Sequence, residues 1–337
     1  MNQYQQGDAV ARAALGIVEA AEALSSAQRV LVVSRGSHAL WRTVVDRLRD
    51  GGASVAHDVR DELDRQWDPP APEALSVRRV GRGARPGVDL LIHHDPFGPG
   101  IRAADPADAT TADAKGGTDK IRHLVDSHVS LMFIDFPHGV DQPALRDRLE
   151  MVYLRALAEP SARLRDRFRD ISGKAAGARA LHLESGAGAR LVIEAPWHIR
   201  DDWASARLDG PVLQMPFGEA WFACSPDRVR GTVRYVSGTH RGTTTESATV
   251  REGLFDHLPG NSGGARVVEV GIGLNARAPW LPAAGLFEKS LHHVHLGFGD
   301  NSMLGGAVRG AEHFDIALPI NTTAWAVQKD GHRVRIA

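Results

Sequence analysis

The spacing of hydrophobic residues changes near Gly177, and this change constrains the fold more than any other feature of the sequence. Before it, short apolar runs typical of buried parallel strands alternate with stretches of helical periodicity. After it, runs of alternating apolar and polar residues are punctuated by glycine, as in antiparallel strands. The 337 residues are enough for two domains. We therefore expect an α/β N-terminal domain over residues 1–177 and a β-rich (α+β) C-terminal domain over residues 178–337.

The rhythm of strand and helix in the first half predicts a small open α/β sheet. Strands are predicted over residues 29–34, 53–59, 88–92 and 129–134. Helices are predicted over residues 1–24, around 40–48 and over 142–174, where Pro160 divides the segment. Residues 96–119 are rich in Gly, Ala, Asp and Pro and lack clear periodicity, so they form either a surface insertion or a lid or partner-binding loop.

Charge and cysteine content exclude several classes of protein. The 40 basic and 41 acidic residues nearly cancel, so nucleic acid is not expected as the main partner. No run approaches the ~18 apolar residues of a membrane-spanning helix, and the polar N-terminus does not resemble a secretory signal, which predicts a cytoplasmic protein. Cys224 is the sole cysteine, which excludes an internal disulfide framework and a multi-cysteine metal site.

The C-terminal third contains the residue types that ligate metals. His313 and Asp315 are two positions apart, so on a strand they face the same side and could hold one ion; His293 and His295 share a face in the same way. Glu269 precedes Gly271 and Gly273, which predicts that its carboxylate lies at the mouth of a tight turn. Glu219 follows a Pro-x-Gly turn, just before an apolar strand. Position alone does not single out most other histidines, His240 among them.

The order of these motifs resembles that of the thermophilic-type metalloaminopeptidases, peptidase family M29 or the aminopeptidase T family. The matching motifs lie between Met215 and Asp315 and read Pro-x-Gly-Glu, Glu-x-Gly-Ile-Gly-x-Asn, Glu-Lys-x5-His-x-Gly-x-Gly-Asp-Asn-Ser and His-x-Asp. The resemblance implies a metal-binding domain with two divalent ions, Zn, Co or Mn, and a homodimer. Carried over residue by residue, it implies the metal ligands Glu219, Glu269, His295, His313 and Asp315, with catalytic roles for Glu219 and Glu269. His293 is the rival for His295.

One position departs from the pattern of that family. Its peptidases carry a tyrosine seven positions after the first histidine ligand, where this chain has Ser302. Either another donor stabilises the tetrahedral intermediate, with Asn301, Ser302, His240 and His293 as the candidates, or peptide hydrolysis is not the reaction. Lys289, beside Glu288, forms either a structural ion pair or a contact with a substrate carboxylate.

The resemblance implies a metal-dependent aminopeptidase or related amide hydrolase that acts on a small peptide. In such a hydrolase two metals about 3.5–4 Å apart activate a water. Two alternatives stay open. An iron-dependent ring-cleaving dioxygenase shares the same scaffold, and its mononuclear iron needs a His/His/Asp face. A peptide-binding protein with little turnover could also keep the fold.

Overall fold

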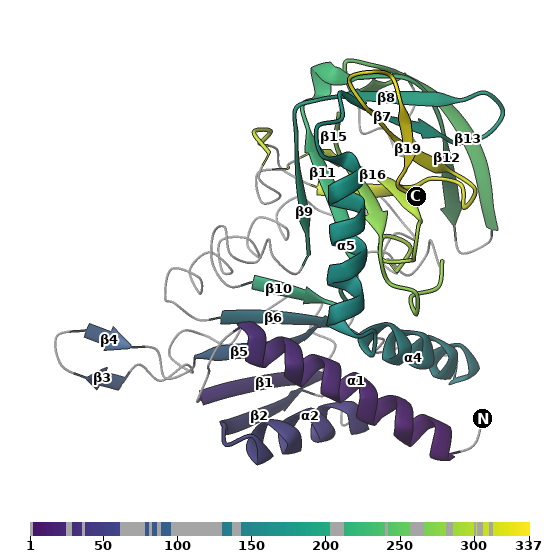
Figure 1. Cartoon of the computed structure of the whole chain (residues 1–337). Coiled ribbons are helices and arrows are strands. Elements are labelled where there is room, and N and C mark those ends of the chain that lie inside the picture. Colours follow the sequence, from purple (N-terminus) through teal and green to yellow (C-terminus); the bar gives the residue numbers. More distant parts are fainter. Residues whose placement is uncertain are drawn as a thin grey trace. The chain divides into compact units, whose positions relative to one another are not determined.

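The computed structural model in Figure 1 describes most of the chain. The described residues are 3–24, 29–35, 38–60, 78–80, 83–85, 89–95, 130–136, 143–202, 212–239, 242–256, 266–280, 286–299, 301, 306–309 and 313–337. Segment 96–119, His240 and Ser302 lie outside these residues. The described chain separates into two compact units. The first contains both helices and strands, and the second consists mainly of strands.

The first unit is built on a parallel five-stranded sheet with the order β10-β6-β5-β1-β2. Its strands are β1 Arg29–Arg35, β2 Ser54–Arg60, β5 Leu90–Asp95, β6 Ser130–Asp135 and β10 Val212–Met215. A separate hairpin pairs β3 Arg78–Val80 with β4 Gly83–Arg85. The helices of this unit are α1 Gln3–Leu24, α2 Ala39–Asp50 and α4 Pro143–Leu157.

Apolar periodicity explains the helices of the first unit. In α2, Leu40, Trp41, Val44, Val45 and Leu48 lie on one face and are buried. The side chain of His38 accepts a hydrogen bond from the backbone N–H of Leu40 and so caps the start of α2. Helix α1 packs against both α2 and α4. The α/β pattern expected from the sequence is therefore present in this unit.

The second unit consists of helix α5 and two antiparallel sheets. The five-stranded sheet has the order β17-β16-β15-β11-β9, with the bounds β9 Trp197–Asp201, β11 Glu219–Cys224, β15 Val267–Gly273, β16 Val294–Gly299 and β17 His313–Ala317. The seven-stranded sheet has the order β14-β13-β12-β8-β7-β18-β19, with the bounds β7 Ala180–Glu184, β8 Arg190–Glu194, β12 Val229–Thr239, β13 Gly242–Arg251, β14 Leu254–Phe255, β18 Thr323–Val327 and β19 Arg333–Arg335.

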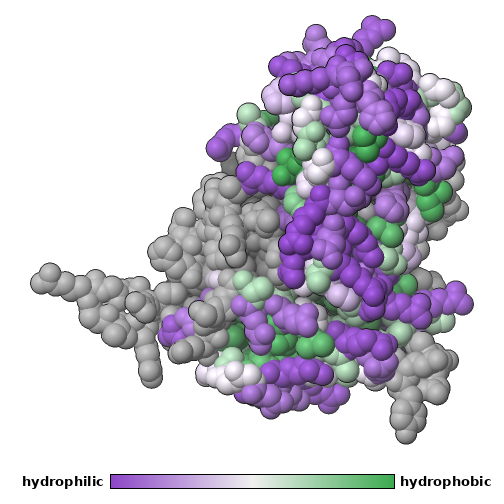
Figure 2. Space-filling model, in the orientation of Figure 1, coloured by the Kyte–Doolittle hydropathy of each residue, from purple (hydrophilic) through white to green (hydrophobic). Residues whose placement is uncertain are grey.

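Buried aromatic rings and one helix support the five-stranded sheet. Phe298 of β16 lies 5.1 Å from the stacked ring of Phe314 and 5.0 Å from the edge-on ring of Phe255. Helix α5 (Ser161–Ala175) turns hydrophilic side chains to solvent (Figure 2) and buries Leu164, Ile171 and Ala175. Arg167 of α5 donates a 2.5 Å hydrogen bond to the carbonyl of Leu274, just after β15.

The compact units and the predicted domains do not have the same limits. The sequence pattern predicted one boundary near Gly177, whereas nearly all of α5 belongs to the second unit. Strand β10 belongs to the first unit although it follows β9 of the second, because β10 pairs with β6. None of the helices that the structure describes combines the length and apolar character that a bilayer crossing needs.

Candidate metal centre

Four neighbouring strands bring the five predicted ligands to one face of the five-stranded sheet. Glu219 begins β11, Glu269 lies in β15, His295 lies in β16, and His313 and Asp315 lie in β17. The register places Glu269 beside Gly297 and, one strand further, Gly297 beside Asp315. It also places His295 beside Gly271, and Glu219 beside Gly273. Glu269, His295 and Asp315 thus each face a glycine on a neighbouring strand, so their side chains have room to lean toward one another.

The glycines are needed because the ligand side chains occupy the space that other residues would fill. A Cβ on Gly271 would lie 2.0 Å from Cε1 of His295 and 2.6 Å from Oε1 of Glu219. A Cβ on Gly297 would lie 2.9 Å from Oδ1 of Asp315 and 2.9 Å from Oε2 of Glu269. The predicted turn after Glu269 is therefore wrong. Strand β15 continues past Glu269 and Gly271 and ends at Gly273, so Gly271 provides clearance rather than a change of direction.

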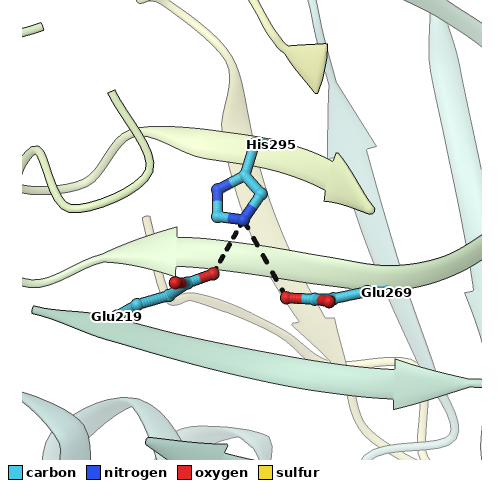
Figure 3. A group of neighbouring side chains, drawn as sticks. All are labelled: Glu219, Glu269 and His295. Atoms are coloured by element: carbon cyan, nitrogen blue, oxygen red, sulfur yellow. Dashed lines mark ion pairs between the residues drawn. The ribbon is translucent and has the colours of Figure 1, made fainter. Parts of the chain in front are cut away.

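The first trio of ligand atoms is buried. Nε2 of His295 lies 2.7 Å from Oε1 of Glu219 and 3.9 Å from Oε1 of Glu269 (Figure 3). The three side chains are at most 7% exposed. All three ligand atoms lie within 4.8 Å of one another, which leaves a space that one ion could occupy between them.

The second trio shares Glu269 with the first and is more open. Nε2 of His313 lies 3.2 Å from Oε2 of Glu269 and 3.5 Å from Oδ1 of Asp315. The His313 side chain is 31% exposed and that of Asp315 is 17% exposed. Because the two oxygens of Glu269 point to different trios, one carboxylate connects both groups.

The polar atoms of the two trios have the character of a cation site. Oε2 of Glu269 and Oδ1 of Asp315 are buried, yet neither accepts a hydrogen bond of suitable geometry from the described residues. Buried carboxylate oxygens without donors cost free energy unless a positive charge covers them. Carboxylate and imidazole ligands suit Zn, Co, Mn or Fe. The buried acidic residues and histidines could therefore bind metal.

The electrostatics of the ligands show how strongly this cluster attracts positive charge. Burial raises the pKa of Glu269 to about 7. Burial lowers the pKa of His295, but the Glu219 carboxylate outweighs that effect and the net pKa rises to about 9. At His313 burial again lowers the pKa, while Asp315 and Glu269 raise it to about 11. The surrounding carboxylates thus favour positive charge at both imidazoles.

A buried lysine lies beside the first trio. Nζ of Lys289 contacts Oε2 of Glu219 and lies 3.6 Å from Oδ2 of Asp202 and 3.8 Å from Oε2 of Glu288. Sequence reasoning paired Lys289 only with its neighbour Glu288 and missed Asp202, whose one local signal was its position directly after the strand that ends at Asp201. The contact with Glu219 joins residues 70 positions apart, which no local pattern indicates.

His293 and Asn301 have structural partners away from the two trios. Nε2 of His293 lies 2.9 Å from the carbonyl oxygen of Leu318, the ring packs against Trp280 and Phe287, and burial lowers its pKa to about 4. The Asn301 side chain donates to the carbonyl of Val268 at 2.9 Å and accepts from the N–H of Val308. The Asn301 amide, one candidate for the missing donor, is thus engaged in hydrogen bonds with the backbone. Of the other accessory candidates, His240 and Ser302 lie outside the described residues.

Solved structures of similar fold include two enzymes. Wild-type AmpT from Thermus thermophilus superposes with a TM-score of 0.60 at 16% identity, over 95% of this chain and 97% of AmpT. The 2,5-dihydroxypyridine dioxygenase from Pseudomonas putida KT2440 superposes with a TM-score of 0.56 at 14% identity, over 96% of each chain. At these identities the likeness shows a shared fold. Neither a scan against protein-family models nor a search of curated proteins finds a match.

Proposed function

We propose that this protein is a metal-dependent aminopeptidase or related amide hydrolase that acts on a small peptide. The observation that carries the proposal is the pair of trios joined by Glu269, one with Glu219 and His295 and one with His313 and Asp315. Two ligand groups that share a carboxylate are the arrangement that a two-metal hydrolase needs. The fold shared with AmpT, an aminopeptidase, supports the same activity.

The charge of the site supports two ions rather than one. Five carboxylates gather there: those of Asp202, Glu219, Glu269, Glu288 and Asp315. Among the described residues, Lys289 is the one lysine or arginine with its charged group within 4.0 Å of them. With all five ionised and both imidazoles neutral, as metal ligands must be, the excess negative charge would be balanced by two divalent cations. A buried site favours near-neutrality because uncompensated charge is costly there.

Different residues of the site would have different roles in such a reaction. When bound, two divalent ions supply Lewis acidity that polarises an amide carbonyl and lowers the pKa of a water. Glu219 and Glu269 would hold the ions and orient the reacting groups. Glu288, which is not among the proposed ligands, is suited to proton transfer because burial and the charge of Asp315 raise its pKa to about 8. A proton held there can pass to the leaving amine.

An iron-dependent ring-cleaving dioxygenase is the second candidate, because an enzyme of that activity has a similar fold. Non-haem iron oxygenases use two histidines and one carboxylate. Nε2 of His295 and Nε2 of His313 lie 4.0 Å and 3.5 Å from Oδ1 of Asp315, so the described residues also offer this ligand set. A peptide-binding protein with little turnover is the third candidate. The homodimer and the cytoplasmic location expected from the sequence remain proposals.

Metal analysis of protein purified without chelator, followed by assays on aminoacyl fluorogenic amides, tests the proposal. We expect about two Zn, Co or Mn ions per chain and turnover of at least one amide, lost in a His313→Ala variant. One iron per chain with activity that air oxidation destroys would instead identify the dioxygenase. Protein without bound metal or turnover would identify the peptide-binding protein.

A further inference from the structure

The two oxygens of Glu219 have different surroundings. Oε1 lies 2.7 Å from Nε2 of His295, inside the first trio, whereas Oε2 contacts the ammonium of Lys289. A carboxylate held in this way presents one oxygen to the trio and keeps the other in an ion pair. An ion bound between Glu219, Glu269 and His295 would therefore meet Glu219 through Oε1 alone.

The ammonium of Lys289 is fixed on more than one side. Oδ2 of Asp202 and Oε2 of Glu288 lie 3.6 Å and 3.8 Å from Nζ, and the Lys289 side chain is only 15% exposed. Burial lowers the pKa of Lys289, but Glu219, Asp202 and Glu288 outweigh it and raise the pKa well above its ordinary value. Lys289 therefore keeps its charge, and its neighbouring carboxylates already occupy the place that a substrate carboxylate would take.

The backbone at Gly218 and Glu219 is hydrogen-bonded to Asp202, which also lies beside Lys289. Oδ2 of Asp202 accepts a 2.8 Å hydrogen bond from the N–H of Gly218, and the N–H of Asp202 donates to the carbonyl of Glu219 at 3.3 Å. Gly218 has a φ of 137°, and a Cβ there would lie 2.5 Å from Cβ of Asn275. The backbone of Glu219 thus has a defined position beside Lys289.

We propose that Lys289 is a positioning residue that restricts Glu219 to a single oxygen ligand and so keeps a coordination position open at the buried ion. The inference rests on the proposed two-metal hydrolase. Catalytic metal sites keep an open position for water, and a carboxylate that binds through both oxygens would fill it. The nearby ammonium also opposes a divalent cation electrostatically, which preserves the Lewis acidity of that cation at some cost in affinity.

Two variants of Lys289 separate its charge from its hydrogen bond. Lys289→Met removes both, and Lys289→Gln removes the charge but keeps an N–H donor toward Glu219. The probe is Co²⁺ added to metal-free protein. Competition with a chelator measures the affinity for Co²⁺. The visible d–d absorption reports the coordination number, because it weakens as that number rises. Lys174→Met is the matched control, since Lys174 pairs with Asp170 on the exposed surface of α5.

We expect both Lys289 variants to bind Co²⁺ about tenfold more tightly than the wild type while turnover falls. The d–d band should weaken in Lys289→Met and stay near that of the wild type in Lys289→Gln and Lys174→Met. A purely structural role predicts the opposite, with weaker Co²⁺ binding and an unchanged band per bound ion, and that result would overturn the inference. If the wild type itself bound no Co²⁺, the metal centre and this inference would both fail.

Discussion

Single glycines decide whether the ligand side chains can converge. Gly271 lies directly beside His295 in the sheet, and the gap it leaves is filled by the imidazole and by Glu219. A methyl group at 2.0 Å from Cε1 cannot be accommodated unless His295 moves. Glycine is therefore needed at this position because a larger residue would displace the side chains of His295 and Glu219, and not because the backbone needs an unusual conformation.

Gly271→Ala should weaken metal binding while the fold is retained. Displacement of His295 alters a ligand, and even changes in residues that only support ligands typically cost about 10–100-fold in metal affinity. The measurement is metal titration of the chelator-treated variant together with its circular dichroism spectrum. Gly173→Ala in α5 is the control, because nothing lies within 4 Å of its new Cβ. Unchanged metal affinity in Gly271→Ala would contradict the packing of the centre.

The histidines His293, His295 and His313 should respond differently to truncation. His295→Ala and His313→Ala should each lower metal content, because their Nε2 atoms lie within 4 Å of the carboxylates of the trios. His293→Ala should leave metal content close to that of the wild type, since its ring lies among Trp280, Phe287 and the Leu318 carbonyl. Elemental analysis of the three variants checks this, and loss of metal from the His293 variant alone would shift the ligand assignment by two residues.

Cys224 should be unreactive in the folded protein. The thiol is buried, and burial together with the charge of Glu269 raises its pKa to about 12. The thiolate is the reactive form, so almost none is present at pH 8. A thiol reagent should modify no cysteine in the native protein at pH 8 and one per chain after unfolding in urea. Fast modification of native protein would show that the end of β11 opens readily.

Local sequence indicated which of the proposed ligands share a face better than it indicated the residues that lie beside them. His313 and Asp315 could be paired because strand geometry fixes the relation of residues two apart. The contacts of Lys289 with Glu219 and Asp202 could not be foreseen, since they depend on how three separate segments meet. Gly271 was misread for the same reason: a glycine near a carboxylate suggests a turn locally, whereas its cause here is a side chain from the next strand.

At the level of elements, close packing of α1 on α4 depends on Gly16. A Cβ at this position would lie 2.4 Å from the carbonyl oxygen of Leu157, the last residue of α4. Helix α1 is otherwise rich in small buried residues, including Ala13 and Ala14, which allow neighbouring helices to approach. Glycine within a helix normally costs up to about 1 kcal/mol relative to alanine, so its presence here indicates a packing requirement.

Gly16→Ala should destabilise the protein by about 1–3 kcal/mol, the usual cost of overpacking. The clash is with backbone, so relief requires that the two helices separate. Gly7→Ala in the same helix has nothing within 4 Å of its Cβ and should be neutral or stabilising by up to about 1 kcal/mol. Urea unfolding of both variants measures the difference. Equal stability of the two would show that α1 and α4 do not meet at Gly16.

The sequence indicated most elements but not all their limits. The strands at 29–35 and 130–135 and the helices on either side of Pro160 were predictable, because long apolar periodicity reports burial. Strand β10 was missed, since four residues show no period and its partner β6 precedes it by about 80 positions. That one pairing also explains why a single boundary near Gly177 does not describe the compact units.

At the scale of the whole molecule, the two units should respond unequally to metal. All five proposed ligands belong to the second unit, and each unit has its own sheet and buried core. Ligand that binds only the folded state stabilises it by RT ln(1 + [L]/Kd), about 2.7 kcal/mol at a concentration of 100 Kd. This added free energy of unfolding applies only to the structure that must unfold before the ions are released. For the proposed centre, that structure is the sheet that contains β11, β15, β16 and β17.

Amide hydrogen exchange with and without Zn²⁺ or Co²⁺ therefore tests the proposed centre without any assay of turnover. At 100 Kd, amides of β11, β15 and β16 that exchange by unfolding of the sheet should slow by about 100-fold, the factor that corresponds to 2.7 kcal/mol. Amides of β1, β5 and β6 in the first unit should keep their rates, because they hold no ligand. The same experiment on Asp315→Ala is the control and should show much smaller protection. Protection spread equally over both sheets would mean that the units unfold together, and protection confined to the first unit would place the metal outside the two trios.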